Sequence, residues 1–505
     1  MSIEPPANIF AQCYARGEAQ VVWITLVADL ETPVSAFLKI AGARPLSFLL
    51  ESVEGGAVRG RYSIIGLDPD LVWRATGSRA EVNRGVRAGR TAFAPCNEPP
   101  LAALRSLLAE SRIALPDALP PMAAGIFGYL GYDVVRLMEE LPQPNPDPIG
   151  IPDAILVRPT IVVVFDAVKD TITAVTPVRP ENGVSAKAAL ARATERLSAI
   201  VDALDRPLDH AAANGQAGSL TVLPSSNTKP AEYEKMVRAA KEYIAAGDIF
   251  QVVLSQRFEA PFELPPFSLY RALRRVNPSP YLYFLNFGDF AVAGSSPEIL
   301  VKVAGGKVTI RPIAGTRPRG TTSHDDKALE VELLADPKER AEHLMLLDLG
   351  RNDVGRVTEI GSVKVTDQFF IERYSQVMHI VSNVEGSLAG KYDAIDALAG
   401  GFPAGTVSGA PKVRAMEIID ELEKEKRGLY AGAVGYFSAA GEMDTAIVLR
   451  TALVKDGTMY VQAGAGIVAD SNPKSEQQEC VNKAKALFRA AEEAKRFASA
   501  AKRGQ

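Results

Sequence analysis

One helical segment, residues 336–353, constrains this chain more than any other, because it places carboxylates on an otherwise apolar face. Asp336 followed by Pro337 is typical of a helix N-cap and a first helical position. Glu339 and Glu342 are three residues apart and therefore share one face of the helix. That face continues with three residues that we expect to be buried: Met345, Leu346 and Leu349. A capping box of Asp336 and Glu339 explains the first glutamate. It does not explain Glu342, since an unpaired buried charge is costly.

A second segment near the C-terminus repeats this spacing. Asn472-Pro473 predicts another helix start, and Glu476, Glu479 and Lys483 follow it at spacings of three and four. One interpretation is a solvated face with a Glu479–Lys483 ion pair. Two Glu-x-x-Glu helices in one chain favour instead a shared site for a hard cation. Mg²⁺ is typically held by a few carboxylates, several waters and an anionic substrate, and no His/Cys cluster with zinc spacing competes for a metal.

Composition and charge exclude several classes of protein. The chain has 505 residues, 47% hydrophobic and 23% charged, which is typical of a globular protein. Its formal net charge is −4 and it has no Lys/Arg-rich block, so we expect no nucleic-acid partner. Three widely spaced cysteines argue against a disulfide framework and favour a reducing cytoplasm. The N-terminus lacks the features of a signal peptide, and the apolar runs are too short to span a bilayer. We therefore expect a cytoplasmic protein that does not enter a membrane.

The pattern of strands and helices predicts the fold class. Residues 47–52 and 61–66 predict an antiparallel pair around a Gly55-Gly56 turn. Residues 249–258 predict a buried strand, and the apolar run 446–454 predicts another. Together these patterns indicate an α+β fold of large, mostly antiparallel, β-sandwich-like sheets faced by helices. Residues 206–229 lack periodicity and are rich in turn formers, which predicts a linker between domains at 20–205 and 230–495.

Four motifs carry a resemblance to a known family. Residues 341–346 are Ala-Glu-His-Leu-Met-Leu, and residues 350–353 are Gly-Arg-Asn-Asp. Residues 403–412 are Pro-Ala-Gly-Thr-Val-Ser-Gly-Ala-Pro-Lys, and residues 464–468 are Gly-Ala-Gly-Ile-Val. On these motifs the chain resembles the chorismate-utilising enzymes, and among them anthranilate synthase component I, the large subunit, from about residue 20 to about residue 495. The resemblance implies the fold of those enzymes, with a feedback site in the N-terminal domain and chorismate binding in the C-terminal one.

Chorismate, the substrate that this resemblance implies, carries two carboxylates that need positive charge and backbone donors. Arg450 is anomalous inside the apolar run 446–454, and it can bind a carboxylate in bidentate geometry; an internal acid is the alternative partner. Gly464 and Gly466, placed at a strand end, would let backbone N–H groups approach an anion, with a tight turn as the alternative. The resemblance implies substrate contacts from Gly315, Thr316, Tyr430, Arg450, Gly464, Ala465 and Gly466.

The catalytic and metal-binding residues also follow from the resemblance. His379 is flanked by apolar residues, where a satisfied core histidine is the alternative, but it matches a histidine beside the substrate ring. Thr406 would form hydrogen bonds and Glu298 would transfer a proton. The expected catalytic set is His379, Thr406, Glu298 and Lys483. The expected Mg²⁺ site has Glu342 and Glu479 as ligands and Glu339 and Glu476 as holders of its waters.

The implied reaction adds ammonia to chorismate and eliminates pyruvate to give anthranilate, the first committed step of tryptophan biosynthesis. Members of this fold that add water to chorismate resemble one another in a basic lysine where this chain has Gln251, which cannot take a proton at neutral pH. Those that make aminodeoxychorismate commonly carry a nucleophilic lysine where this chain has Ala314. An aminodeoxychorismate, isochorismate or salicylate synthase is the enzymatic alternative. A catalytically inactive binding protein is the non-enzymatic one.

The resemblance also implies partners. None of the three cysteines lies in a Gly-rich elbow, so glutamine-derived ammonia would come from a separate amidotransferase subunit, anthranilate synthase component II, in a heterotetramer of two of each. Tryptophan is the expected feedback inhibitor. Its expected pocket is formed by Leu50, Glu51, Ser52, Pro280, Tyr281 and Leu282.

Overall fold

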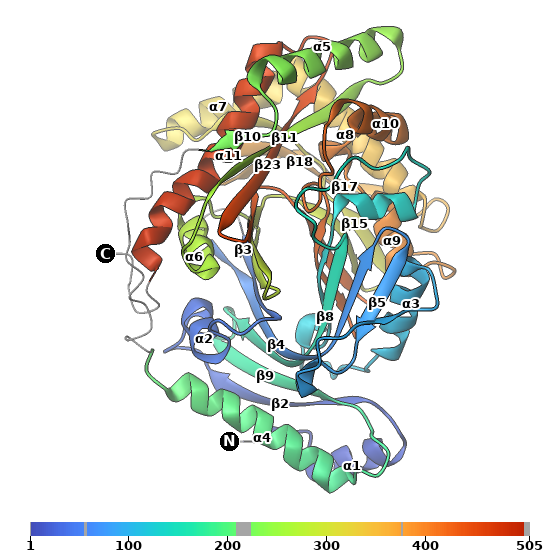
Figure 1. The fold of residues 1–505 in the computed structure, drawn as a ribbon, viewed down its shortest axis with the longest axis vertical. Coiled ribbons are helices and arrows are strands. Elements are labelled where there is room, and N and C mark those ends of the chain that lie inside the picture. Colours follow the sequence, from blue (N-terminus) through green and yellow to red (C-terminus); the bar gives the residue numbers. More distant parts are fainter. Residues whose placement is uncertain (1, 55–57, 209–223, 375–376, 499–505) are drawn as a thin grey trace.

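The structure is a computed structural model that describes residues 2–54, 58–208, 224–374 and 377–498. Its strands lie in the middle of the molecule and most helices lie outside them (Figure 1). The described strands form one hydrogen-bonded system of 23 strands, and the pairings between them are antiparallel. This arrangement confirms the predicted α+β class with large antiparallel sheets.

The first nine strands form the sheets of the N-terminal part of the chain. β8 is buried at all of its positions; it pairs with β4 along its length, with β7 at its start and with β9 at its end. β3 and β4 form the predicted antiparallel pair, although the predicted Gly55-Gly56 turn lies outside the described residues. The strands are β1 (Ile3–Glu4), β2 (Gln20–Val27), β3 (Ser47–Glu54), β4 (Val58–Thr76), β5 (Arg79–Asn83), β6 (Ala94–Pro95), β7 (Gly125–Leu130), β8 (Ala154–Asp166) and β9 (Thr171–Val178).

The remaining strands belong to the C-terminal part. The longest ladder among these strands joins β11 to β23, which confirms the buried strand predicted from the β-branched content of residues 249–258. The strands are β10 (Ser225–Ser226), β11 (Gln251–Pro261), β12 (Tyr281–Asn286), β13 (Phe290–Ser296), β14 (Ile299–Ala304), β15 (Lys307–Ile310), β16 (Ile313–Pro318), β17 (Lys364–Arg373), β18 (Val377–Ser387), β19 (Gly409–Ala410), β20 (Ala433–Ser438), β21 (Met443–Ile447), β22 (Thr451–Lys455) and β23 (Thr458–Ile467).

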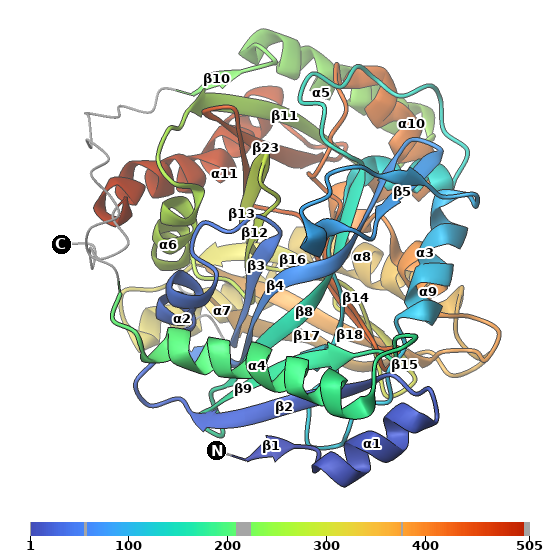
Figure 2. The same ribbon diagram turned by 60° about the horizontal axis from the view of Figure 1, so that its bottom comes forward.

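Helices cover the sheets from outside. α4 packs on β2 and β9 and lies below them in Figure 1, and the turned view of Figure 2 again shows it beside these strands. α11 packs on β23, α5 and α6. α8 packs on β16 and β18. The helices are α1 (Ala7–Ala15), α2 (Pro33–Ile40), α3 (Pro100–Glu110), α4 (Ala186–Asp205), α5 (Pro230–Ala246), α6 (Pro266–Val276), α7 (Ser323–Ala335), α8 (Pro337–Gly355), α9 (Ala394–Gly401), α10 (Lys412–Leu422) and α11 (Pro473–Glu493). Short 3₁₀ segments are η1 (Val86–Ala88), η2 (Pro121–Ala123), η3 (Tyr132–Leu137), η4 (Gly405–Val407) and η5 (Ala494–Phe497).

Strands from the two predicted domains pair with each other. β3 pairs with β12, so that Ser52 is opposite Tyr281, and β7 pairs with β20, so that Tyr129 is opposite Val434. The largest hydrophobic cluster likewise combines side chains from both parts of the chain, such as Leu49 with Phe284. The two parts therefore share sheets and core. Within the predicted linker, β10 pairs with β11, and residues 209–223 lie outside the described residues.

The strand predicted at residues 446–454 is wrong, because the chain changes sheet partners in the middle of it. β21 pairs with β14 and β20, whereas β22 pairs with β13 and β23. Arg450, between them, has a φ of 46°, which is left-handed backbone and ends an extended strand. The apolar pattern continued through this turn because both strands are buried.

Candidate active site

A buried carboxyl and a threonine from distant parts of the chain meet at the centre of the C-terminal sheets. Glu298 lies between β13 and β14 and is 7% exposed. The hydroxyl of Thr406, on η4, lies 3.1 Å from each carboxylate oxygen of Glu298. Burial raises the pKa of Glu298 to about 8, although the hydrogen bond from Thr406 acts in the opposite direction. Glu298 therefore holds a proton at neutral pH.

His379 lies on β18 beside a bulge in β16. Gly315 is the extra residue of that bulge, and its φ of 69° is left-handed backbone that glycine adopts without strain. The bulge aims the carbonyl oxygen of Gly315 at Nδ1 of His379, 2.9 Å away, and the Thr316 hydroxyl lies 3.1 Å from the same nitrogen. A carbonyl only accepts, so Nδ1 carries the proton. Burial lowers the pKa of His379 to about 4, which leaves Nε2 as a neutral acceptor.

Arg450 carries a positive charge without a carboxylate partner. No acidic side chain in the described part of the chain forms an ion pair with Arg450. This excludes the internal acid that the sequence left open as its partner. Burial lowers the pKa of Arg450, and Arg450 contributes to lowering the pKa of His379. The two side chains therefore share one electrostatic environment. A desolvated guanidinium without a counter-charge suits an anionic ligand.

Gly464 and Gly466 lie in β23 close to its end at Ile467, as predicted, so the tight turn considered from the sequence is wrong. Gly464 pairs with Ser255 of β11, and a Cβ at Gly464 would lie 2.7 Å from the Tyr430 hydroxyl. This close approach requires glycine. β22 pairs only with residues 458–461 of β23, so β22 does not cover the following edge, where the Gly464 carbonyl accepts from Lys483. Ala465 faces a hydrophobic cluster with Cys480 and contributes only its backbone.

The two glutamate helices begin where the sequence predicts. The side chain of Asp336 caps α8 and that of Asn472 caps α11. The predicted capping box is wrong, because the N–H of Asp336 donates to carbonyl oxygens at the end of α7. The Glu339 carboxylate instead faces Arg317, 3.4 Å away. On the stripe of α8, Leu346 is buried as predicted, and the other two apolar residues are half-buried.

Glutamates of α8 and α11 act on one another across the site. Burial raises the pKa of Glu342, and the carboxylates of Glu339 and Glu479 raise it further. Glu342 itself forms no ion pair with the described residues, whereas Lys483 pairs with Glu479 at 2.7 Å and donates to the Gly464 carbonyl at 2.9 Å. In the described ranges, no group of three or more His, Cys, Asp or Glu side chains is arranged as metal ligands. A set of repelling carboxylates with oxygen donors nevertheless fits a hard cation such as Mg²⁺.

The residues predicted to bind tryptophan meet on adjacent strands, and all six of them line one cavity. Leu50, Ser52 and Tyr281 line a cavity of about 750 Å³, to which Tyr436 and Tyr374 also contribute. We call this the β3–β12 cavity; Pro280 lines it as well. Leu282 packs in the hydrophobic cluster that includes Phe284.

The Glu51 carboxylate is already neutralised. It accepts hydrogen bonds from Arg274, at 2.7 and 3.0 Å, and from the Tyr270 hydroxyl at 2.5 Å. Sequence reasoning missed both partners, because they lie far along the chain on α6. It also missed four residues that shape the active site: Tyr374, whose ring packs edge-on against His379; Lys412, which forms a buried ion pair with Asp353 of the Gly-Arg-Asn-Asp motif; Glu423; and Arg427.

Comparison with known proteins now bears on this arrangement. The sequence model of the chorismate binding enzyme family matches residues 57–489. Anthranilate synthase component 1 of Cereibacter sphaeroides is 57% identical over 98% of this chain and 99% of its own length. The chain belongs to the anthranilate synthase component 1 family. The enzyme of that name from Pseudomonas aeruginosa is 51% identical over 92% of this chain and 94% of its own length.

Solved structures agree with this membership of the anthranilate synthase component 1 family. Anthranilate synthase component I from Streptococcus pneumoniae superposes with a TM-score of 0.74 at 38% identity, covering 92% of this chain and 98% of that one. The menaquinone-specific isochorismate synthase of Escherichia coli has a TM-score of 0.69 at 22% identity, covering 94% and 95%, and that likeness concerns the fold alone. The three cysteines are free, as predicted. Within the described ranges, no helix combines the length and apolarity needed to cross a bilayer.

Proposed function

We propose that this chain converts chorismate and ammonia to anthranilate and pyruvate in the cytoplasm, as the first committed step of tryptophan biosynthesis. Its family membership supports the reaction, and the observation that carries it in the structure is Arg450. This buried guanidinium has no carboxylate partner in the described part of the chain, and it lies in the electrostatic environment of His379. A dicarboxylate substrate supplies the missing counter-charge.

Binding would use backbone and aromatic groups around that charge. Arg450 would bind a substrate carboxylate, and the edge of residues 464–466 that β22 does not cover would donate backbone N–H groups to it. Tyr430 lies against Gly464, and its hydroxyl is kept neutral because burial raises its pKa. Gly315 and Thr316 fix the orientation of His379.

Two buried groups would handle protons. Glu298 is protonated at neutral pH, so it can donate a proton to the departing hydroxyl as ammonia adds. Thr406 then stabilises the resulting carboxylate, because its hydroxyl is within hydrogen-bond distance of both oxygens. His379 offers a neutral Nε2 as an acceptor near the ring. These roles divide acid and acceptor between groups whose pKa values burial has moved apart.

Mg²⁺ is the cation that the carboxylates of α8 and α11 would hold. Glu342 and Glu479 would be its ligands, and Glu339 and Glu476 would hold its waters. Burial raises the pKa of Glu476 as it does that of Glu342, so both gain when a cation neutralises them. Bound Mg²⁺ supplies positive charge that stabilises charge developing on the substrate. Lys483 keeps Glu479 in place through their ion pair.

Two positions favour amination and aromatisation over the related reactions. Gln251 is buried on β11, and a carboxamide cannot serve as the base that water addition requires. Ala314 is buried on β16, where a nucleophilic lysine would be needed for aminodeoxychorismate formation. Direct attack by ammonia therefore remains as the chemistry that these side chains permit.

Ammonia from glutamine would require a second protein. Burial raises the pKa of Cys480 to about 11, and its thiol contacts the Tyr233 hydroxyl at 3.1 Å, so it is not an activated nucleophile. Cys13 and Cys96 lie near the surface and outside any Gly-rich elbow. We infer that a glutamine amidotransferase, component II, supplies ammonia in an assembly of two copies of each chain.

Tryptophan would inhibit by binding in the β3–β12 cavity. The cavity has the volume and the aromatic walls for an indole, and Asp444 in its lining has a buried carboxylate oxygen without a hydrogen bond. That oxygen can accept an ammonium N–H. Tyr374, which also lines the cavity, packs against His379, so a ligand there would be in contact with the active site.

The product mixture tests the proposal. The purified chain is incubated with chorismate, Mg²⁺ and ammonium salt at alkaline pH, and the products are separated by chromatography. Anthranilate and pyruvate in equal amounts are expected, with no turnover when glutamine replaces ammonium. Dominance of aminodeoxychorismate, isochorismate or salicylate would show that the reaction is wrong even though the family is right.

A further inference from the structure

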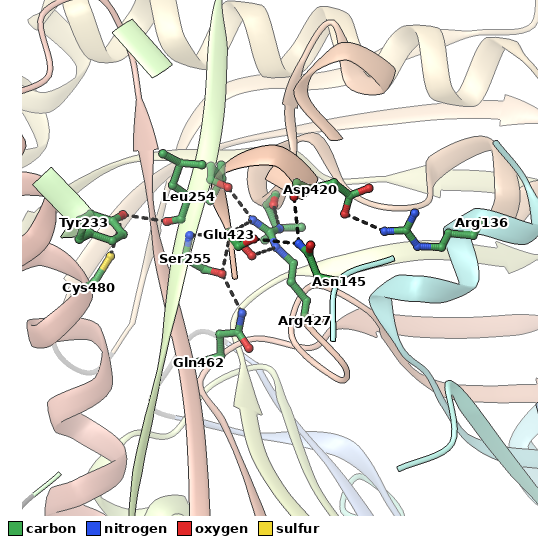
Figure 3. Close-up of polar contacts among 12 residues, drawn as sticks. Arg136, Asn145, Tyr233, Leu254, Ser255, Asp420, Glu423, Arg427, Gln462 and Cys480 are labelled. Carbon is green, nitrogen blue, oxygen red and sulfur yellow. Dashed lines mark hydrogen bonds and ion pairs between the residues drawn. The ribbon is translucent and has the colours of Figure 1, made fainter. Parts of the chain in front are cut away.

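A fully buried ion pair lies next to the active site, with the ring of Tyr430 beside its guanidinium. Arg427 and Glu423 are 3% and 7% exposed, and their side chains form two hydrogen bonds, at 2.6 and 3.0 Å. Figure 3 shows this pair at the centre of a network of polar contacts that reaches Ser255 and Gln462 on one side. Such a pair seldom adds stability over apolar side chains of similar volume. Its geometry therefore calls for another explanation.

The Arg427 guanidinium connects two separate elements through their backbones. One terminal nitrogen donates to the carbonyl oxygen of Val407 at 2.7 Å, and the other donates to that of Val253 at 2.6 Å. Val407 ends η4 and Val253 lies on β11. The rings of Tyr132 and Tyr430 lie 4.8 and 5.4 Å from the guanidinium carbon, so water is kept from the pair.

Glu423 fixes the orientation of that guanidinium. Its carboxylate also accepts from the N–H and the hydroxyl of Ser255 on β11, at 2.8 and 2.9 Å. The carboxylate and the β11 carbonyl therefore hold Arg427 from one side, and the remaining donor is directed at η4. A planar fork holds several acceptors at fixed separations through different nitrogens, whereas the three donors of a lysine ammonium share one nitrogen and have no fixed direction.

We propose that Arg427, held by Glu423, is a positioning residue that fixes the η4 turn against β11 so that Thr406 meets Glu298. Thr406 immediately precedes the carbonyl that Arg427 holds, and its hydroxyl lies 3.1 Å from each oxygen of Glu298. This inference rests on the proposed function, since it assigns how that reaction's acid is kept in place. Arg427 acts through Thr406 and does not touch the substrate.

The proposal has a consequence in pH dependence. The hydrogen bond from Thr406 lowers the pKa of Glu298, which burial holds at about 8. Release of η4 removes that hydrogen bond, so the pKa of Glu298 rises further. Other groups near Glu298 are constant: Tyr374 stays neutral because burial raises its pKa, Asp353 in the same small cavity is paired with Lys412, and β16 contributes a backbone hydrogen bond from Ile313.

A double-mutant cycle tests the assignment. The variants are Arg427→Lys, Thr406→Val and both together, with kcat, KM and the pH profile measured for ammonia-dependent anthranilate formation. We expect each single change to lower kcat about 10- to 100-fold with KM changed less than about threefold, and the double variant to lose no more than the worse single one. The alkaline limb should move to higher pH in all three. Two results would overturn the proposal. One is a double variant in which the two losses of kcat multiply. The other is an Arg427→Lys variant with a lowered kcat whose pH profile keeps its alkaline limb at the wild-type pH.

Two controls separate positioning from general damage. Arg158→Lys alters another buried arginine, paired with Asp70 and Glu110, and should leave kcat within about twofold of wild type. The second variant, Arg427→Met combined with Glu423→Gln, leaves no buried charge unpaired and keeps an acceptor for Ser255, so it is expected to fold.

Hydrogen exchange on that double variant provides a readout that does not depend on turnover. Amides of residues 405–408 should exchange faster than in wild type, while those of the Arg158 region are unchanged. Unchanged exchange at 405–408 would overturn the inference. A wild-type chain that makes no anthranilate would instead refute the proposed function, and the exchange result would still decide whether Arg427 fixes η4.

Discussion

The active site and the β3–β12 cavity differ in whether their buried charged side chains have partners within the chain. In the active site, Arg450 and Glu342 lack ion-pair partners among the described residues, and Glu298 is kept protonated. Beside the β3–β12 cavity, Glu51 is bound by Arg274 and a tyrosine hydroxyl. Unpaired charge is expensive, so its concentration in one region indicates where charged ligands complete the structure. The paired Glu51 contributes to stability without a ligand.

The largest expected effect comes from the metal-binding carboxylates. Glu342→Gln or Glu479→Gln should reduce activity by at least about 1,000-fold, because Mg²⁺ loses a charged ligand. The fold should persist, since Glu342 has no ion pair in the described structure to lose and the Glu479–Lys483 pair is half-exposed. Thermal unfolding measured with and without Mg²⁺ checks the site independently of turnover: wild type should be stabilised by the ion and the variants should not. Near-wild-type activity of either variant at limiting Mg²⁺ would contradict the assignment.

Arg450 provides the next effect. Arg450→Met should lower kcat/KM for chorismate about 100-fold, because a hydrogen-bonded charge contact is worth about 1.5–3 kcal/mol and more than one contact is lost. Steady-state kinetics over a wide chorismate range measures this. Arg105→Met, which removes a half-exposed partner of Asp393 and Asp396, is the matched control and should have little effect. Equal losses in both variants would mean that Arg450 is not special.

The pH dependence of Glu298 gives a moderate effect. With free ammonia held constant, kcat should fall as pH rises through about 8, because the proton-donating form of Glu298 is lost. Glu298→Gln should be slow and should lack this fall in kcat at alkaline pH.

The stability of the fold should also decrease with rising pH. The pKa of Glu298 in the folded chain lies above the ordinary value of 4.5, so wild type loses stability as pH rises from about 4.5 to about 8. Over that range the melting temperature of Glu298→Gln should rise relative to that of wild type. If the two melting temperatures change with pH in parallel, the raised pKa of Glu298 is refuted.

The smallest effects distinguish the two sides of β3. Ser52→Arg places a long charged side chain in the β3–β12 cavity and should abolish tryptophan inhibition with basal activity unchanged; inhibition curves and calorimetric tryptophan binding measure it. Glu51→Gln weakens the pairing with Arg274 and should cost about 1–3 kcal/mol of unfolding free energy. If Ser52→Arg leaves inhibition intact, tryptophan binds elsewhere.

Local chemistry was predictable from the sequence, whereas partners distant along the chain were not. Helix starts at Asp336 and Asn472 follow from their side chains and the prolines after them, so they were predicted correctly. The spacing of Glu479 and Lys483 likewise predicted their ion pair. By contrast, Glu51 and Arg274 form a hydrogen bond although they are 223 positions apart in the sequence. Periodicity in the sequence cannot predict such a contact.

The errors also have physical causes. An apolar run does not reveal a change of sheet partners, so the left-handed turn at Arg450 was missed. The capping box failed because the preceding helix supplies acceptors for the N–H of Asp336. Glu423 and Arg427 have helical spacing, but the chain leaves α10 before them, so their pairing gave no recognisable signal. The resemblance supplied the expected catalytic residues, and the structure added the groups that contact them.

The pairing of β7 with β20 has a consequence for synthesis on the ribosome. The hydroxyl of Ser438, at the end of β20, donates to the carbonyl oxygen of Pro121, 317 positions earlier in the chain. At about 5–20 residues per second, β7 emerges roughly 15 to 60 seconds before the strand that covers its edge. β3 likewise waits for β12. During that interval the nascent chain exposes unpaired edges that invite wrong partners, so chaperone binding should be strongest before residue 438 is made.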